Sequence, residues 1–142
     1  MKKIISVILL ITMLCCLTAC GDSKFVGTYE RETSRKHYIV VPKDAGQWLH
    51  NDTITGTATY EIHSGGTGKY YFTADKAAYY GENYVIIDAD IEWEVVDDYL
   101  YVTGTAYYKD ASNESFEIDE QFVLEGKTLV DATYNEIRYN KK

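Results

Sequence analysis

Cysteine, proline and histidine are all scarce in this chain, and each shortage excludes a class of structure or chemistry. The three cysteines, Cys15, Cys16 and Cys20, lie within the first 20 residues, so the rest of the chain has no internal disulfide and no cysteine metal site. The three histidines lack the spacing of metal ligands. A single proline, Pro42, is compatible with a sequence made mostly of strands. We therefore expect no metal and no cofactor.

Basic residues are also few. The chain has 14 Lys and Arg against 22 Asp and Glu, a formal net charge of −8. An acidic chain is repelled by phosphate backbones, so nucleic acid is excluded as a partner. The glycine-rich stretch 65–68 is not followed by a lysine or a helical pattern, which makes it a turn and not a phosphate-binding loop.

The only long apolar run is too short to cross a membrane. Lys2 and Lys3 precede about eleven apolar residues from Ile4 to Leu14, whereas a spanning helix needs roughly twenty. The layout is that of a secretory signal. Its end, Leu17-Thr18-Ala19-Cys20, resembles the lipobox of bacterial lipoproteins. The alternatives are an uncleaved anchor, for which the run is too short, and an ordinary secretory signal, for which Leu17 is too large.

The lipobox resemblance implies a location and a domain plan. Residues 1–19 are the signal peptide, Cys20 becomes the lipidated N-terminus, 20–24 form a short tether, and 25–142 form one domain. The processed chain keeps 12 of its 14 basic residues and all 22 acidic ones, a formal charge of −10. We expect it in the bacterial cell envelope, attached to the extracytoplasmic side of a membrane by the lipid on Cys20.

Tyrosine is abundant, with 14 residues, and its apolar ring and polar tip suit half-buried strands. Tyr84 to Val96 alternates apolar and mostly acidic residues without interruption. Asp97-Asp98 predicts a two-residue turn, after which Tyr99 to Tyr108 returns. This turn places Trp93 opposite Val102, and Val95 opposite Leu100.

Six further strands are predicted from weaker patterns: Val26–Glu32, Lys36–Val41, Thr53–His63, Lys69–Ala74, Glu114–Leu124 and Thr128–Tyr139. The last of them loses its alternation between Asp131 and Glu136, which predicts a bulge or a break. Eight consecutive strands favour an all-β antiparallel up-and-down meander closed into a small barrel. A two-sheet β-sandwich is the alternative.

Two motifs resemble lipocalins. Gly27-Thr28-Tyr29 resembles the G-x-W opening of that family, with Tyr29 in place of the barrel-closing tryptophan. Trp93-Glu94-Val95, continued through Asp98, Leu100 and Val102, resembles a hairpin of small lipocalin-like bacterial lipoproteins. The resemblance implies a barrel that can hold a small apolar ligand, and it supplies no catalytic residue.

Strand order predicts two unlike ends. Short connections at 33–35, 64–68, 97–98 and 125–127 lie at one end, and longer ones at 42–52, 75–83 and 109–113 lie at the other with both termini. Small inward residues toward the second end predict a pocket or a plug there: Gly56, Ala58, Ala74, Ala89, Gly104 and Ala106. The candidate ligand-binding residues are Trp48, Tyr79, Tyr80 and Trp93.

No nucleophile and base pair is apparent, so we do not expect an enzyme. The one carboxylate pair of interest is Glu120 and Asp131, which a turn at Glu125-Gly126 places opposite each other. The favoured function is a membrane-anchored, non-enzymatic interaction or inhibitor-like module that binds another envelope protein. The alternative is a lipocalin-like carrier of a small apolar ligand at the membrane surface.

Overall fold

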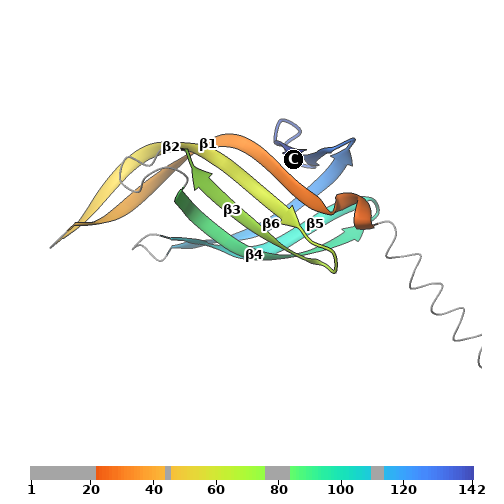
Figure 1. Ribbon diagram of the computed structural model, residues 1–142, viewed down its shortest axis with the longest axis horizontal. Coiled ribbons are helices and arrows are strands. Elements are labelled where there is room, and N and C mark those ends of the chain that lie inside the picture. The colour runs from red at the N-terminus through yellow and green to blue at the C-terminus, as the bar shows by residue number, and fades with distance from the viewer. Residues whose placement is uncertain (1–21, 44–45, 76–83, 110–113) are drawn as a thin grey trace, which may run out of the picture.

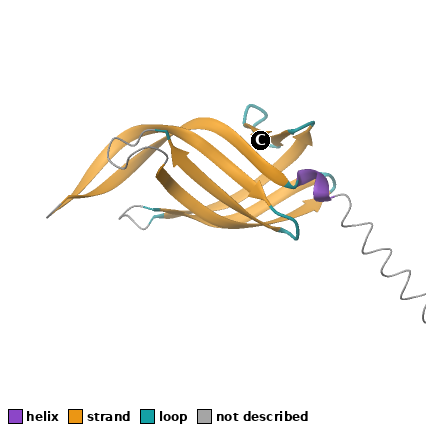
Figure 2. Cartoon of the chain, in the orientation of Figure 1, coloured by secondary structure: helices purple, strands orange, loops and turns teal. Residues whose placement is uncertain are grey.

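The structure is a computed structural model that describes residues 22–43, 46–75, 84–109 and 114–142. Figure 2 shows that strands make up nearly all of this part, after one 3-10 turn. The elements are η1 (Ser23–Phe25), β1 (Gly27–Lys43), β2 (Gly46–Ile62), β3 (Thr67–Ala74), β4 (Tyr84–Val96), β5 (Tyr99–Tyr108), β6 (Ser115–Glu125), β7 (Thr128–Asp131) and β8 (Arg138–Lys141).

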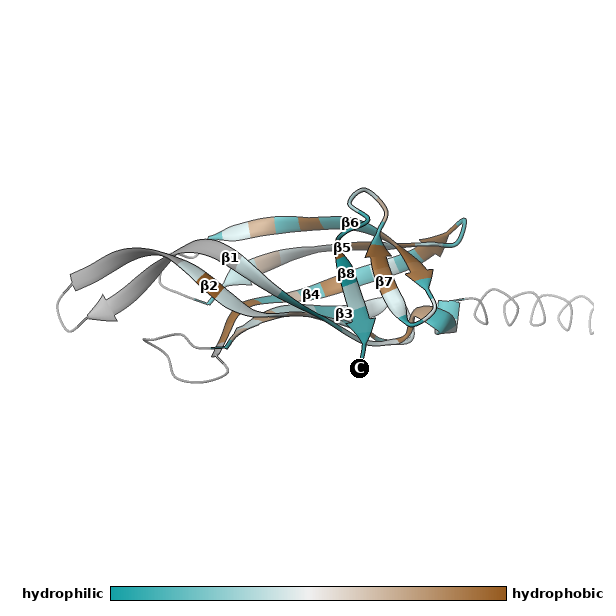
Figure 3. Ribbon diagram, turned by 90° about the horizontal axis from the view of Figure 1, so that it is seen from above, coloured by the Kyte–Doolittle hydropathy of each residue, from teal (hydrophilic) through white to brown (hydrophobic). Residues whose placement is uncertain are grey.

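The strands form a closed barrel in the order β1 to β8, and each is antiparallel to its neighbours (Figure 1). This confirms the predicted all-β meander over the sandwich. Closure of a sheet removes its outermost edges, and consecutive strands pair through short connections. Apolar and polar positions alternate along β4 and β6 in Figure 3, as expected for strands with one face toward a core.

The β4–β5 hairpin has the predicted register. Trp93 pairs with Val102, and Val95 pairs with Leu100. Asp97 and Asp98 both have positive φ, 51° and 68°, the conformation that a two-residue hairpin turn requires and that aspartate tolerates better than most residues.

β1 and β2 differ from the prediction. The residues 33–35, predicted as a turn, lie inside β1, where Thr33 pairs with Gly56 and Ser34 with Thr55. Their polar side chains have turn-like propensity, but continuous pairing with β2 overrides it. β1 therefore runs on to Lys43, and the predicted loop 42–52 is mostly strand. The resulting hairpin projects beyond the other strands on the left of Figure 1.

This difference moves the termini. The short connections 63–66, 97–98 and 126–127 lie together, as predicted, and the strand ends Lys43, Ala74 and Tyr108 lie at the opposite end. η1 joins the short connections because the first two predicted strands are one strand, and the C-terminus joins them because the last predicted strand is two strands, β7 and β8. Lys24 of η1 bonds Asp98, with 2.6 Å between Nζ and Oδ1. We call this half of the barrel the tight-turn end.

The predicted irregularity in the last strand is a complete break. Oδ1 of Asp131 accepts hydrogen bonds from the backbone N–H groups of Thr133 and Tyr134, both at 2.8 Å. This local turn, typical of aspartate, diverts the chain from β6. β7 therefore ends at Asp131, and β8 begins only at Arg138.

The predicted pairing of Glu120 with Asp131 is wrong. The β6–β7 turn is Gly126-Lys127, one residue later than predicted, since Glu125 pairs with Thr128. Gly126 has a φ of +63°, which glycine adopts without strain. Asp131 consequently lies opposite Phe122, and the two carboxylates do not form an adjacent pair.

A second small correction concerns the start of β4. Phe72 pairs with Ile87, but Thr73 pairs with Val85, so Ile86 is an extra residue in the ladder. Such a bulge shifts the alternation of side chains. Ile86 is therefore buried, while Val85, predicted to face inward, is only half-buried.

The barrel closes through a short seam between β1 and β8. Only Tyr29 with Lys141 and Glu30 with Asn140 are paired. Nζ of Lys141 donates to the carbonyl of Val26 at 2.7 Å and lies 5.5 Å from the centre of the Tyr29 ring. Gly27 leaves room for this crossing, since a Cβ there would collide with the Lys141 side chain. Fully buried Tyr29 thus lies at the closure, where the lipocalin resemblance places a tryptophan.

Candidate functional site

The predicted ligand-binding residues fall largely outside the described side chains. Cys20, Tyr79 and Tyr80 lie outside the described residues. Trp48 belongs to β2, where its backbone pairs with Val41, and its side chain also lies outside the described part. Of the predicted set, only Trp93 has a described side chain.

Trp93 holds the β2–β3 turn in place. Its indole Nε1 donates to the carbonyls of His63 and Thr67, both at 2.9 Å, and its backbone N–H donates to Gly66 at 2.8 Å. The side chain is 8% exposed. These bonds satisfy the polar group of a buried tryptophan, so the residue has a packing role in the tight-turn end.

Two of the small inward residues provide space that larger side chains fill. A Cβ at Gly56 would lie 2.8 Å from Cζ of Phe72, and one at Gly104 would lie 3.1 Å from Cγ2 of Ile91. Phe72 and Ile91 are both buried. The predicted line of small residues therefore includes at least two positions where the absence of a side chain serves close packing against a larger buried neighbour.

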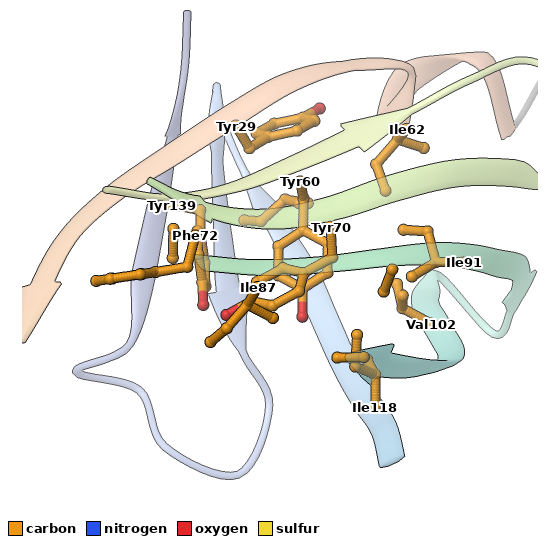
Figure 4. Close-up of a cluster of buried hydrophobic side chains, with 14 of the residues drawn as sticks. Tyr29, Tyr60, Ile62, Tyr70, Phe72, Ile87, Ile91, Val102, Ile118 and Tyr139 are labelled. Carbon is orange, nitrogen blue, oxygen red and sulfur yellow. The ribbon is translucent and has the colours of Figure 1, made fainter. Parts of the chain in front are cut away.

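Tyrosine rings occupy the middle of the barrel (Figure 4). The Tyr60 ring lies 4.7 Å from Tyr70, 5.4 Å from Phe122 and 5.2 Å from Tyr139, measured between ring centres. The tilted and edge-to-face angles of these pairs are the favourable ones for aromatic rings. This cluster fixes the packing between β2, β3, β6 and β8.

A carboxylate enters this aromatic cluster. The hydroxyl of Tyr60 donates to Oε2 of Glu120 at 2.7 Å. Burial, followed by the negative charge of Glu120, raises the pKa of Tyr60 well above its ordinary value, so Tyr60 remains a donor at neutral pH. The sequence signal for this contact is the position of Glu120 between the inward residues Ile118 and Phe122, where an apolar residue is expected.

Tyr29 contrasts with Tyr60. Its hydroxyl is buried and has no hydrogen-bond partner within the described residues. Burial raises the pKa of Tyr29. An unpartnered buried hydroxyl is unfavourable compared with a hydrogen atom at the same position.

The outer surface of β4 and β5 combines acids with tyrosines. Asp88, Asp90, Glu92 and Glu94 lie along one side of β4, and Tyr101 and Tyr107 lie opposite Glu94 and Asp88 on β5. Nζ of Lys109 lies 2.9 Å from Asp88, and Nζ of Lys69 lies 3.8 Å from Asp90. Such exposed pairs contribute little to stability.

Two grooves lie on this outer surface near the tight-turn end. One has a volume of about 480 Å³ and is bordered by Lys69, Asp90 and Glu92. The other, of about 470 Å³, is bordered by Glu92, Glu94 and Tyr101. Both are open and bordered by charged side chains, which suits contact with another macromolecule better than enclosure of a small apolar molecule.

The chain enters the barrel beside a third groove of about 380 Å³, bordered by Asp22, Ser23, Gly65 and Trp93 among others. The ion pair between Lys24 and Asp98 lies at the same end, and the hydrogen bond from Lys24 lowers the pKa of Asp98. The start of the domain is therefore attached to the tight-turn end.

Within the described ranges, no three His, Cys, Asp or Glu side chains are arranged to hold a metal ion. No helix in that part of the chain combines the length and the apolar character needed to cross a bilayer. Comparisons with protein-family models, curated proteins and solved structures found no match.

Because only one of the two tyrosine hydroxyls has a hydrogen-bond partner, removing them should change the stability of the protein differently. Tyr60→Phe should lower the free energy of unfolding by about 1.5–3 kcal/mol, because it removes a hydrogen bond to a carboxylate. Tyr29→Phe removes a hydroxyl without a partner and should leave stability unchanged or slightly raised. Urea unfolding followed by tyrosine and tryptophan fluorescence measures both. Equal losses in the two variants would contradict the different environments described above.

Proposed function

We propose that the chain is a lipoprotein of the bacterial cell envelope, attached through a lipid on Cys20 and exposed on the extracytoplasmic side of a membrane. The lipobox-like end of the N-terminal segment supports this, together with the absence of cysteine after residue 20. The barrel then acts as a non-enzymatic interaction module that binds another envelope protein, in the manner of an inhibitor or adaptor.

The observation that best supports the interaction role is that the interior of the barrel is filled by side chains, whereas the outer surface has grooves. Large side chains such as Phe72 and Ile91 occupy the space beside Gly56 and Gly104, and tyrosine rings fill the middle of the barrel. The outer surface instead has open grooves bordered by acidic side chains and by half-buried Tyr101. Fold alone does not determine function, and here the surface carries the contact chemistry.

The contacts of η1 support an orientation for the proposed module. Two residues, Gly21 and Asp22, separate Cys20 from η1, a reach of about 10 Å when extended. Because η1 bonds the tight-turn end through Lys24 and Asp98, that end lies next to the membrane. The longer connections and the projecting β1–β2 hairpin then point away from it, which reverses the orientation expected from the sequence.

Lipidation is tested at the cysteines. The full chain, expressed in bacteria fed an alkyne analogue of palmitate, should incorporate the label and sediment with membranes. Cys20→Ala should lose both properties, because no other residue in the chain continues a lipobox. Cys16→Ala, which removes a cysteine within the signal, is the matched control and should keep them. Labelling of the Cys20→Ala variant would refute the proposal.

The orientation of the barrel relative to the membrane is tested by measuring how close spin labels at its two ends lie to the membrane. A nitroxide attached at Lys127→Cys, an exposed position in the β6–β7 turn, should be broadened by a membrane-bound relaxation agent, because this site belongs to the tight-turn end and leaves the Lys24–Asp98 ion pair intact. A nitroxide at Glu114→Cys, at the end with the longer connections, should be accessible to an aqueous agent instead. The reverse order of accessibilities would show that the barrel is turned the other way.

Native mass spectrometry separates the interaction role from the carrier alternative. The full chain, released from membranes in mild detergent, should give the mass of the lipid-modified polypeptide alone. A chain that carries an apolar ligand would show an additional, stoichiometric mass that disappears on denaturation. That result would favour the lipocalin-like carrier.

A further inference from the structure

Strand pairing closes the barrel at the tight-turn end, but farther from that end β6 and β1 lack a paired neighbour on the side where β7 and β8 stop. β6 runs from Ser115 to Glu125, but β7 pairs only with its last four residues, beginning at Phe122. β1 runs to Lys43, but β8 pairs only with Tyr29 and Glu30. Between these two strands, no ladder joins the remaining residues within the part of the chain that the structure describes.

The hydrogen bonds show which backbone groups are available on β6. The carbonyl of Gln121 accepts the N–H of Ala132 on the β7 side, whereas the carbonyl of Glu114 accepts the N–H of Tyr108 on the β5 side. Backbone groups alternate sides along a strand. The N–H and C=O groups of three residues, Ser115, Glu117 and Asp119, therefore point away from β5.

These backbone groups have no hydrogen-bond partner in the described residues. The cause is the turn at Asp131, which diverts the chain just where β7 would otherwise continue along β6. Unpaired groups on a strand edge form a template for another strand. We refer to the stretch Ser115–Asp119 as the β6 edge.

The side chains beside the β6 edge indicate which residue types a partner strand would need. Glu117 and Asp119 are exposed on the outer surface, and Ile118 is buried on the inner one. Glu32, on the unpaired side of β1, is also exposed. A strand added to β6 would thus place alternate residues beside carboxylates and the others beside the core.

A second copy of the chain fits this edge poorly. Two β6 edges side by side would bring Glu117 and Asp119 of both copies together, and like charges directly opposite each other destabilise a strand pair. The net charge of −8 adds repulsion between copies. The acids instead complement lysine and arginine.

We propose that the β6 edge binds an extended segment of a partner protein, in which Lys or Arg residues alternate with apolar residues, as an added strand. The backbone pairing supplies affinity, and the alternating side chains supply selectivity. This inference rests on the proposed interaction role and names the surface and the chemistry of its partner.

The probe is a ten-residue peptide of alternating lysine and valine, and the protein is the full chain in detergent micelles. Residue-resolved amide hydrogen exchange should show slower exchange at Ser115, Glu117 and Asp119 when the peptide is present. The same peptide with methylated backbone nitrogens keeps the charge but cannot form a ladder. It should bind at least about tenfold more weakly, since the hydrogen bonds donated to the carbonyls of Ser115, Glu117 and Asp119 are lost.

Variants at Asp119 separate pairing from charge. Asp119→Pro removes an N–H that points away from β5, so an edge strand tolerates it, and peptide affinity should fall about tenfold. Asp119→Asn keeps the N–H and should reduce affinity only about twofold to threefold. Asp75→Asn, the same charge change at an exposed position just after β3, should have no effect. If Asp119→Pro does not fold, the methylated peptide still decides.

Three results would overturn the inference. The first is no binding of the lysine–valine peptide, and the second is equal binding of the methylated one, which indicates charge attraction alone. The third is protection of the β6 edge without peptide that increases with protein concentration, which identifies a second copy as the occupant. Each of these leaves the lipidation at Cys20 and the membrane location unaffected, so failure here is distinguishable from failure of the proposed function.

Discussion

The turn at Asp131 determines how this barrel closes. One carboxylate oxygen accepts two backbone N–H groups within the next three residues, and this local bonding competes with continuation of the strand. The chain leaves β6 after four residues of β7 and returns as a β8 of equal length. Eight strands form a closed ladder as a result, but the last two complete it only at the tight-turn end.

Because β7 and β8 are short, few residue pairs are left to close the barrel between β8 and β1. Two residue pairs close it, and Lys141 strengthens it by reaching the carbonyl of Val26 across the face of Tyr29. The core beside the seam is dominated by aromatic rings from β1, β2, β6 and β8. Aromatic rings bury large apolar areas, so this packing adds stability beside a seam that has few strand pairs.

Sequence reasoning succeeded where alternation was unbroken. The β4–β5 register follows from period-two alternation on both sides of Asp97-Asp98, and the break in the last strand follows from the loss of alternation after Asp131. It failed at Thr33 and Ser34, because polar residues on a strand with an exposed outer face look like a turn. Only the pairing with β2 distinguishes the two, and pairing is non-local.

That single misjudged turn had a larger effect than its length suggests. It merged two predicted strands and so moved the N-terminus to the opposite end, while the break after Asp131 added a strand and moved the C-terminus to that same end. Contacts that depend on distant residues were equally inaccessible from sequence. The bond between Tyr60 and Glu120 joins strands 60 residues apart, and the open β6 edge depends on where two other strands stop.

Closure at one end and an open edge at the other are compatible with a tethered binding module. Under the proposed anchoring, the fully paired tight-turn end lies beside the membrane, where the lipid and the short tether restrain it. The unpaired β6 edge lies farther along the barrel and remains accessible from the envelope space. An exposed edge risks pairing with identical copies, and Glu117 and Asp119 oppose this by repulsion. The same charges would select a basic strand, so protection against self-association and selection of a partner follow from one arrangement of carboxylates.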